Sequence, residues 1–247
     1  MNQSPPKGFE TLGRAKRIMT ENIKKPSWFL NLTEGFRSFF EFLNCLYFLA
    51  FYKYTKQGNG QPVMVVPGLL GSDTSTALLR KFITKLGYTA YGWELGRNLG
   101  NMEDLKLLTK KIEDIHQKHQ QKVILIGWSL GGIYVRELAK ANPEWIAQIF
   151  TLGSPFANLD APNHAKWVFS LFNDMDKIDP VLRNQIPNHA AVPTTAIYSK
   201  QDGIVPWQAC MEQKEDDWHK NIEVSGSHFG FTVNTAVFEI IKKSLPQ

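Results

Sequence analysis

The stretch VILIGWSLGG (123–132) decides the fold that we predict for this chain. Its first four residues form a continuous apolar run, which is typical of a strand buried on both faces. The next five match the pattern G-x-S-x-G, and a helical segment, residues 129–141, ends just before Pro143. A serine between a strand and a helix in this pattern lies on a sharp, strained turn that exposes its hydroxyl above the sheet. The sequence therefore predicts that Ser129 is a nucleophile.

Strands and helices alternate on both sides of this stretch. We predict strands near residues 62–66, 88–93, 123–126, 146–152, 194–198 and 222–224, and helices near residues 72–86, 102–120, 129–141 and 235–243. This alternation requires crossover connections, which build a mostly parallel sheet of about six strands with helices on both faces. At 247 residues, 43% of them hydrophobic, the chain fits one α/β domain. Sites in such sheets form at the carboxyl ends of the strands.

A serine hydroxyl needs a base at neutral pH. Among the six histidines, only His228 follows the last predicted strand, within GSHFG (226–230). The chain order Ser…Asp…His places the base at this position. The other histidines have different predicted settings: His116 and His119 are solvated on a charged helix, His219 lies in the charged run 215–220, and His164 and His189 lie in a long insertion where they either pack or contact substrate.

The base in turn needs an acid that fixes its tautomer and stabilises the imidazolium. Asp202 follows the fifth predicted strand, in SKQDGIVPW (199–207), and we predict that it has this role. Two alternatives remain open. Asp202-Gly203 is simply a turn, or the acid is one of three aspartates that precede the strand, Asp174, Asp176 and Asp179.

The tetrahedral intermediate carries an oxyanion that backbone amides stabilise. One donor is the amide after the nucleophile, that of Leu130, and the other comes from the loop after the first strand, PGLLG (67–71). In this loop we predict that Leu69 is the donor, with Leu70 as the alternative. These residues imply no metal and no other cofactor.

Residues 155–193 interrupt the alternation of strands and helices. An insertion of this length is usually functional or contains helices of its own. It holds an apolar cluster around Trp167 and Phe169, and later the turn-forming pair Ile186-Pro187. We predict a small helical cap over the strand ends, with an ordinary surface excursion as the alternative.

Residues 1–57 differ in composition from residues 58–247, which we assign to the α/β domain. The first 25 residues carry six basic and two acidic side chains, so that +4 of the net charge of +5 lies there. This arm is either a solvated leader or a segment attracted to acidic lipid headgroups. Nucleic-acid binding is not expected, because the rest of the chain has no basic stripe or recognition motif. The polar N-terminus resembles no signal peptide, and Cys45 and Cys210 fit packing positions in a reducing compartment, so we expect a cytoplasmic protein.

Residues 28–52 are predicted to form an amphipathic helix. Its apolar positions follow a three- to four-residue spacing: Phe29, Leu32, Phe36, Phe39, Leu43, Leu46 and Ala50. Glu34, Arg37 and Glu41 interrupt the segment, whereas a membrane-spanning helix needs about 20 mainly apolar residues. Either this helix packs on the domain, or it acts with the basic arm as a peripheral contact to the inner face of a membrane.

Five motifs carry a resemblance to a known family: VVPGLLGSD (65–73), GWSLGG (127–132), TLGSPF (151–156), SKQDGIVPW (199–207) and GSHFG (226–230). On these motifs the chain resembles bacterial α/β hydrolases of the lipase and esterase type, over about residues 61–243. Pro67 stands where many members have histidine in the oxyanion loop, and Trp128 recurs in carboxylesterases acting on acyl-chain esters. The stretch GWELGRNLG (92–100) is similar to poorly characterised bacterial relatives and has no predicted role. The first two strands common in the superfamily have no counterpart here.

The predicted triad and the resemblance together imply a serine ester hydrolase, a lipase or carboxylesterase of lipid metabolism with the α/β-hydrolase fold. Ser129 would attack an acyl carbonyl, His228 would take its proton, Asp202 would orient the base, and water would release the acid from the acyl-enzyme. The apolar insertion and N-terminal helix favour a hydrophobic acyl substrate. Thioesterase or acyltransferase chemistry would use the same residues. The alternative of another class is a hydrolase-fold protein that only binds a ligand or a membrane surface.

Overall fold

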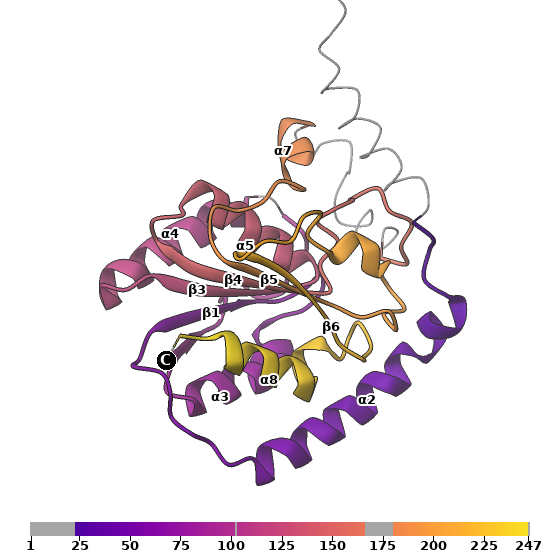
Figure 1. The fold of residues 1–247 in the computed structure, drawn as a ribbon, viewed down its shortest axis with the longest axis horizontal. Helices are drawn as coiled ribbons and strands as arrows, with labels where there is room; N and C mark the ends of the chain where they lie inside the picture. Colours follow the sequence, from indigo (N-terminus) through magenta and orange to yellow (C-terminus); the bar gives the residue numbers. More distant parts are fainter. Residues whose placement is uncertain (1–22, 102, 166–179, 247) are drawn as a thin grey trace, which may run out of the picture.

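Six parallel strands form the single sheet of the computed structural model, which describes residues 23–101, 103–165 and 180–246. The strands are β1 (Pro62–Val66), β2 (Thr89–Tyr91), β3 (Val123–Trp128), β4 (Ile146–Leu152), β5 (Thr194–Tyr198) and β6 (His219–Glu223). Their order across the sheet is β2-β1-β3-β4-β5-β6, and every neighbouring pair is parallel (Figure 1). The predicted α/β class with a mostly parallel sheet is confirmed.

Helices cover both faces of the sheet. They are α2 (Trp28–Phe51), α3 (Ala77–Lys85), α4 (Asp104–His119), α5 (Leu130–Ala141), α7 (Pro180–Gln185) and α8 (Thr235–Ser244), with short 3₁₀ turns η1 (Asp73–Thr76), η3 (Trp207–Cys210) and η4 (Phe231–Val233). Helices α3 and α8 cover one face, with α2 lying outside them, and α4 and α5 cover the other (Figure 1). The predicted helices on both faces are therefore confirmed.

Strands β1 and β3 are apolar at every position because both faces of each strand meet a helix layer. All five residues of β1 are buried. Successive side chains on a strand point to opposite faces. Accordingly, Val63 and Val65 pack in the cluster with α3 and α8, whereas Met64 and Val66 pack in the cluster with α4 and α5. A continuous apolar run is thus the expected sequence of a strand in this position.

Two local predictions are wrong. Strand β6 begins at His219, before the predicted residues 222–224, because the Asp216 carboxylate accepts the amides of Trp218 and His219 and turns the charged run into the strand. His116 and His119 are half-buried and hydrogen-bonded within the protein, and not fully solvated as predicted. The ring of His116 lies 2.9 Å from Gln121 O, and that of His119 lies 2.7 Å from the Tyr91 hydroxyl.

The predicted cap, residues 155–193, is described in part. Residues 166–179 lie outside the described residues, and with them the apolar cluster around Trp167 and the rival acids Asp174, Asp176 and Asp179. The described part of this insertion includes helix α7. The cap and its boundaries therefore stay a prediction.

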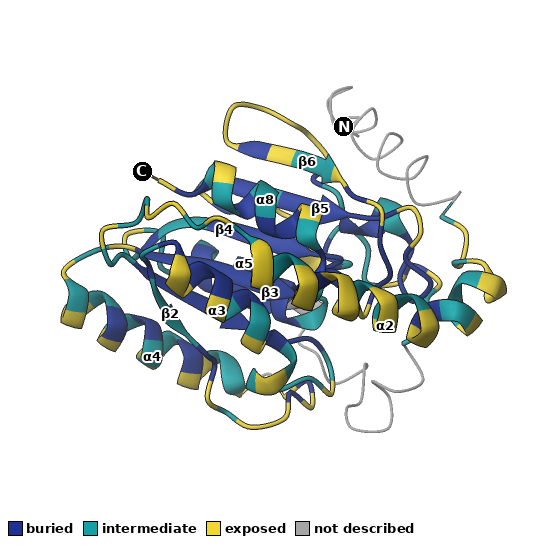
Figure 2. Ribbon diagram, turned by 90° about the horizontal axis from the view of Figure 1, so that it is seen from below, coloured by how far each residue is buried: buried dark blue, intermediate teal, exposed yellow. Residues whose placement is uncertain are grey.

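Helix α2 lies along the outside of the domain, beside α8 (Figure 2). Cys45 is fully buried, and the Phe48 ring lies 6.1 Å from that of Phe82 and 6.3 Å from that of Phe238. These contacts fix the C-terminal half of α2 to the domain. Within the described ranges, no helix has the length and hydropathy needed to cross a bilayer.

Candidate active site

Ser129 occupies a sharp turn between β3 and α5. Its backbone has a φ of 53°, in the left-handed region that a residue with a side chain rarely adopts. The turn closes because its flanking glycines have no side chains. A Cβ at Gly127 would overlap the carbonyl of Gly131, and one at Gly131 would overlap the carbonyl of Val66. The Ser129 amide donates to Leu152 O at 2.8 Å, which ties the turn to β4.

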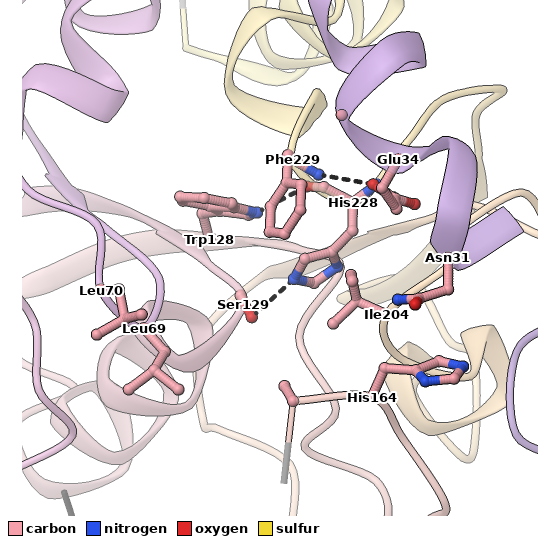
Figure 3. Close-up of a pocket in the computed structure, with 12 residues that line it drawn as sticks. Asn31, Glu34, Leu69, Leu70, Trp128, Ser129, His164, Ile204, His228 and Phe229 are labelled. Atoms are coloured by element: carbon pink, nitrogen blue, oxygen red, sulfur yellow. Dashed lines mark hydrogen bonds between the residues drawn. The ribbon is translucent and has the colours of Figure 1, made fainter. Parts of the chain in front are cut away.

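Three predicted site residues from three separate loops come together at the carboxyl ends of the strands. His228 Nε2 lies 3.0 Å from Ser129 Oγ, a contact that Figure 3 marks with a dashed line, and His228 Nδ1 lies 2.6 Å from Asp202 Oδ2. Asp202 is 3% exposed, and its other oxygen accepts the amides of Ile204 and Val205, both at 2.8 Å. With Nδ1–H donating to the carboxylate, Nε2 is left to accept the serine proton.

The charges around His228 stabilise the protonated form of its imidazole ring. Burial by itself lowers the pKa of His228, but the charge of Asp202, its hydrogen bond and the charge of Glu34 together raise the pKa above its usual value. A carboxylate at 2.6 Å therefore outweighs the loss of water around the ring.

The predicted oxyanion loop lies beside Ser129. Its two leucines differ in one respect: the Leu70 amide donates to Asn98 O at 2.7 Å. Leu70 is thus engaged elsewhere, with a φ of 62°. Among the described residues, the amides of Leu69 and Leu130 have no hydrogen-bond acceptor. This favours the predicted pair, Leu69 and Leu130, over the alternative with Leu70.

The stretch GWELGRNLG (92–100), which had no predicted role, braces this oxyanion loop. Asn98 is fully buried, and its side-chain amide donates to Pro67 O at 2.8 Å. Its backbone accepts from Leu70 and donates to Gly71 O at 2.8 Å. The Asp73 carboxylate holds the start of the same stretch through the amides of residues 93 and 94. A fully buried asparagine is the kind of residue that braces a loop in this way, but the sequence alone does not show which loop it contacts.

Glu34 of α2 is a second residue that sequence reasoning missed. It is 2% exposed. Its Oε1 accepts the amide of Gly203 at 2.7 Å and that of His228 at 3.1 Å, and its Oε2 accepts the amide of Phe229 at 3.3 Å. One carboxylate thus joins the loop of Asp202 to the loop of His228. Figure 3 shows Glu34 above the ring of His228.

Two more contacts fix the loop that carries His228. Glu41, one heptad after Glu34 and so on the same face of α2, accepts the amide and the hydroxyl of Ser227, both at 2.8 Å. The indole of Trp128 donates to His228 O at 3.0 Å. The sequence did contain a signal for these contacts, because two carboxylates lie seven residues apart in a helix that is otherwise mainly apolar.

A pocket of about 340 Å³ opens beside the Ser129 hydroxyl. Its lining consists of Asn31, Glu34, Gly35, Leu69, Leu70, Trp128, Ser129, His164, Ala165, Ile204, His228 and Phe229. Most of the exposed lining is apolar, as expected for a small-molecule site, and His228 lies beside the serine while Asn31 and His164 lie farther from it (Figure 3). His164 of the insertion faces this pocket, whereas His189 lies elsewhere, 2.9 Å from the buried Glu212.

A parallel sheet with Ser129 in a sharp turn after its third strand, and with Asp202 and His228 after its fifth and sixth, is the arrangement of the α/β-hydrolase fold. Within this fold, the sequence of the chain matches one particular family. It belongs to the family described as PGAP1-like alpha/beta domain, whose model matches residues 89–235. This match includes Ser129, Asp202 and His228. The oxyanion loop and α2 precede it.

Solved structures share the fold at low sequence identity. The mature form of the Bacillus licheniformis lipase BlEst2 is 18% identical with a TM-score of 0.57, covering 78% of this chain and 95% of the lipase. A monoacylglycerol lipase from Paleococcus ferrophilus is 15% identical with a TM-score of 0.54, covering 74% and 96%. Aspergillus fumigatus lipase B is 16% identical with a TM-score of 0.55, covering 76% and 53%. No curated protein sequence matches this chain.

Proposed function

We propose that this protein is a serine ester hydrolase that cleaves carboxylic esters of hydrophobic acyl groups. The observation that carries the proposal is the continuous hydrogen-bonded series Ser129–His228–Asp202 at the edge of a mainly apolar pocket. The same order of side chains serves acyl transfer on unrelated folds. Its lipase neighbours support the proposal at the level of the fold.

The reaction would proceed through an acyl-enzyme on Ser129. Its Oγ attacks the acyl carbon while His228 Nε2 takes the hydroxyl proton. The resulting oxyanion accepts hydrogen bonds from the amides of Leu69 and Leu130. The intermediate then expels the alcohol, which His228 protonates. Water, deprotonated by His228, releases the acid and restores the serine, while Asp202 stabilises the imidazolium at each stage.

The lining of the pocket favours binding of an apolar acyl group over a charged one. Its walls near the serine include Leu69, Leu70, Ile204 and Phe229. Burial of an acyl chain there would contribute about 0.8 kcal/mol for each methylene removed from water. We therefore expect kcat/KM for p-nitrophenyl esters to rise with acyl length until the pocket is filled.

Labelling with a fluorophosphonate probe tests the proposal directly. We expect the wild type to be labelled, and Ser129→Ala and His228→Ala to remain unlabelled while keeping the wild-type circular dichroism spectrum. A parallel panel of esters and thioesters, with and without an acceptor alcohol, separates hydrolase, thioesterase and acyltransferase activity. A folded wild type that the probe does not label would argue instead for a protein that binds a ligand without turnover.

A further inference from the structure

The outward face of α2 is apolar along its whole length. Of the 16 large hydrophobic side chains that are exposed in the described residues, 11 lie on this helix: Trp28, Phe29, Leu32, Phe36, Phe39, Phe40, Phe42, Leu43, Leu46, Tyr47 and Phe51. Phe36 is 67% exposed and Trp28 is 72% exposed. Figure 2 shows exposed residues recurring along α2. A contiguous apolar surface of this size on a folded domain is typical of an interaction site.

The charged residues of α2 face the other way. Glu34 is buried against the loops of the acid and the base, and Glu41 binds Ser227. Arg37, the basic residue of the helix, donates to Glu34 and to Gln201 O. The exposed residues of α2 that are not apolar are Gly35 and Asn44, neither of which carries charge. The outward face therefore presents no carboxylate.

Basic residues flank the same helix. Lys24 and Lys25 precede it and Lys53 and Lys56 follow it, all four exposed. The sequence before the helix adds to this, since residues 1–25 carry six basic and two acidic side chains. Positive charge at both ends of an apolar face complements an anionic lipid surface, where each cation strengthens binding.

We propose that α2 docks the protein on an anionic lipid surface, lying in the plane of the interface with its aromatic face among the headgroups and upper acyl chains. At 24 residues, α2 offers about 36 Å of apolar length. The buried face, held by Glu34, Glu41 and Cys45, stays on the domain, so that lipid meets one side of the helix. Two copies of this chain would instead bring their basic flanks together, which disfavours self-association through this face.

Docking on α2 places the lipid beside the pocket. Asn31, Glu34 and Gly35 of this helix are among the residues that line it, and Figure 3 shows Asn31 and Glu34 extending from α2 on the side of the pocket that His228 occupies. Phe229, which is 48% exposed, lies at the same pocket. An acyl substrate could then pass from the lipid to Ser129 without crossing water. This last step rests on the proposed esterase function, whereas docking itself does not.

Vesicle flotation of the full chain tests the docking. We compare vesicles of phosphatidylcholine alone with vesicles of phosphatidylcholine and phosphatidylglycerol, at low and at high salt. The variant Phe36→Ser/Phe39→Ser/Leu43→Ser removes three outward side chains that do not line the pocket. We expect the wild type to float with the anionic vesicles, and the triple variant to partition at least about tenfold less.

Matched variants separate the apolar and electrostatic contributions. Leu107→Ser/Trp218→Ser changes two side chains that are 56% and 55% exposed on other parts of the surface, and should bind like the wild type. Lys24→Gln/Lys25→Gln should weaken binding to anionic vesicles on the order of tenfold, and high salt should remove this difference. Flotation needs no turnover, so the result stands even if the protein proves not to hydrolyse esters.

Three outcomes would overturn the proposal. The triple variant could float as well as the wild type, the wild type could bind both vesicle types equally or neither, or analytical ultracentrifugation could find a wild-type dimer that the triple variant loses while neither floats. The last result would assign the face to a contact between copies. An unchanged rate of the triple variant on a soluble short-chain ester would establish that its site is intact.

Discussion

Helices α5 and α2 hold opposite ends of the candidate triad, and they are buried to different degrees. Helix α5 begins directly after Ser129 and buries eight of its twelve residues, among them Val135 and Arg136. Helix α2 has 24 residues and buries Glu34 and Cys45. Ser129 thus rests on an element packed between strands and helices, whereas His228 is held by a buried carboxylate from a mostly exposed helix.

The difference shows that the apolar side chains of the two helices have different roles. On α5 the apolar side chains supply the packing, so the position of Ser129 follows from the core. On α2 most of the large apolar side chains face outward, and polar contacts from Glu34 and Glu41 hold the helix to the loops of Asp202 and His228. Any movement of α2 would therefore act on the base and the acid before it acted on the nucleophile.

The largest expected effect is at the α5 end. Ser129→Ala removes the only atom proposed to form a bond with substrate, so we expect kcat to fall by about 10⁶ with the fold unchanged. Ester hydrolysis under saturating substrate, with thermal unfolding as the control for folding, measures this. Residual activity above a hundredth of the wild type would exclude Ser129 as the nucleophile.

The next effect is at the base. Asp202→Asn removes the carboxylate 2.6 Å from His228, and we expect kcat to fall by about 10⁴. The neutral ring is the active form, and the pKa of His228 is raised, so wild-type activity declines as the pH falls through that raised pKa. Without the Asp202 charge this decline should move to lower pH. A profile that keeps its position in Asp202→Asn would show that another group sets it.

Replacing an apolar side chain by serine should have unequal costs on the two helices. Val135→Ser on α5 replaces a fully buried side chain by a smaller, polar one, and should lower the free energy of unfolding by about 3 kcal/mol. Phe36→Ser on α2 replaces a side chain that is 67% exposed, and should change the free energy of unfolding by no more than about 0.5 kcal/mol. Urea unfolding of both variants gives the comparison, and similar losses would contradict the exposed position of Phe36.

The smallest expected change in rate comes from Glu34→Gln. Glutamine keeps one acceptor oxygen for the amides of Gly203 and His228 but loses the charge that helps to raise the pKa of His228. We expect kcat to fall about tenfold and the acid limb of the pH profile to move to lower pH. Glu137→Gln on α5 is the matched control, since Glu137 pairs with Lys140 away from the pocket. A fall in kcat without a shift of the limb would point to a purely structural role.

Most of the fold, and the turn that carries Ser129, could be predicted from the sequence. The run before Ser129 and its two glycines leave few other arrangements, because a strand buried on both faces and a tight turn each demand particular residues. The positions of Asp202 and His228 after successive strands followed from the topology of a parallel sheet. The role of Asn98 could not be predicted, because its partners at residues 67 and 70 are joined to it only through tertiary contacts.

The sequence by itself determined that α2 is a helix with one apolar face, because helical spacing depends only on local periodicity. It could not determine which face meets the domain. Burial of apolar area would favour the aromatic face, yet the structure turns Glu34 and Glu41 inward, toward the amides of residues 203 and 227–229. Those amides lie far along the chain, and only the tertiary structure brings them to α2. Its outward aromatic face is the consequence.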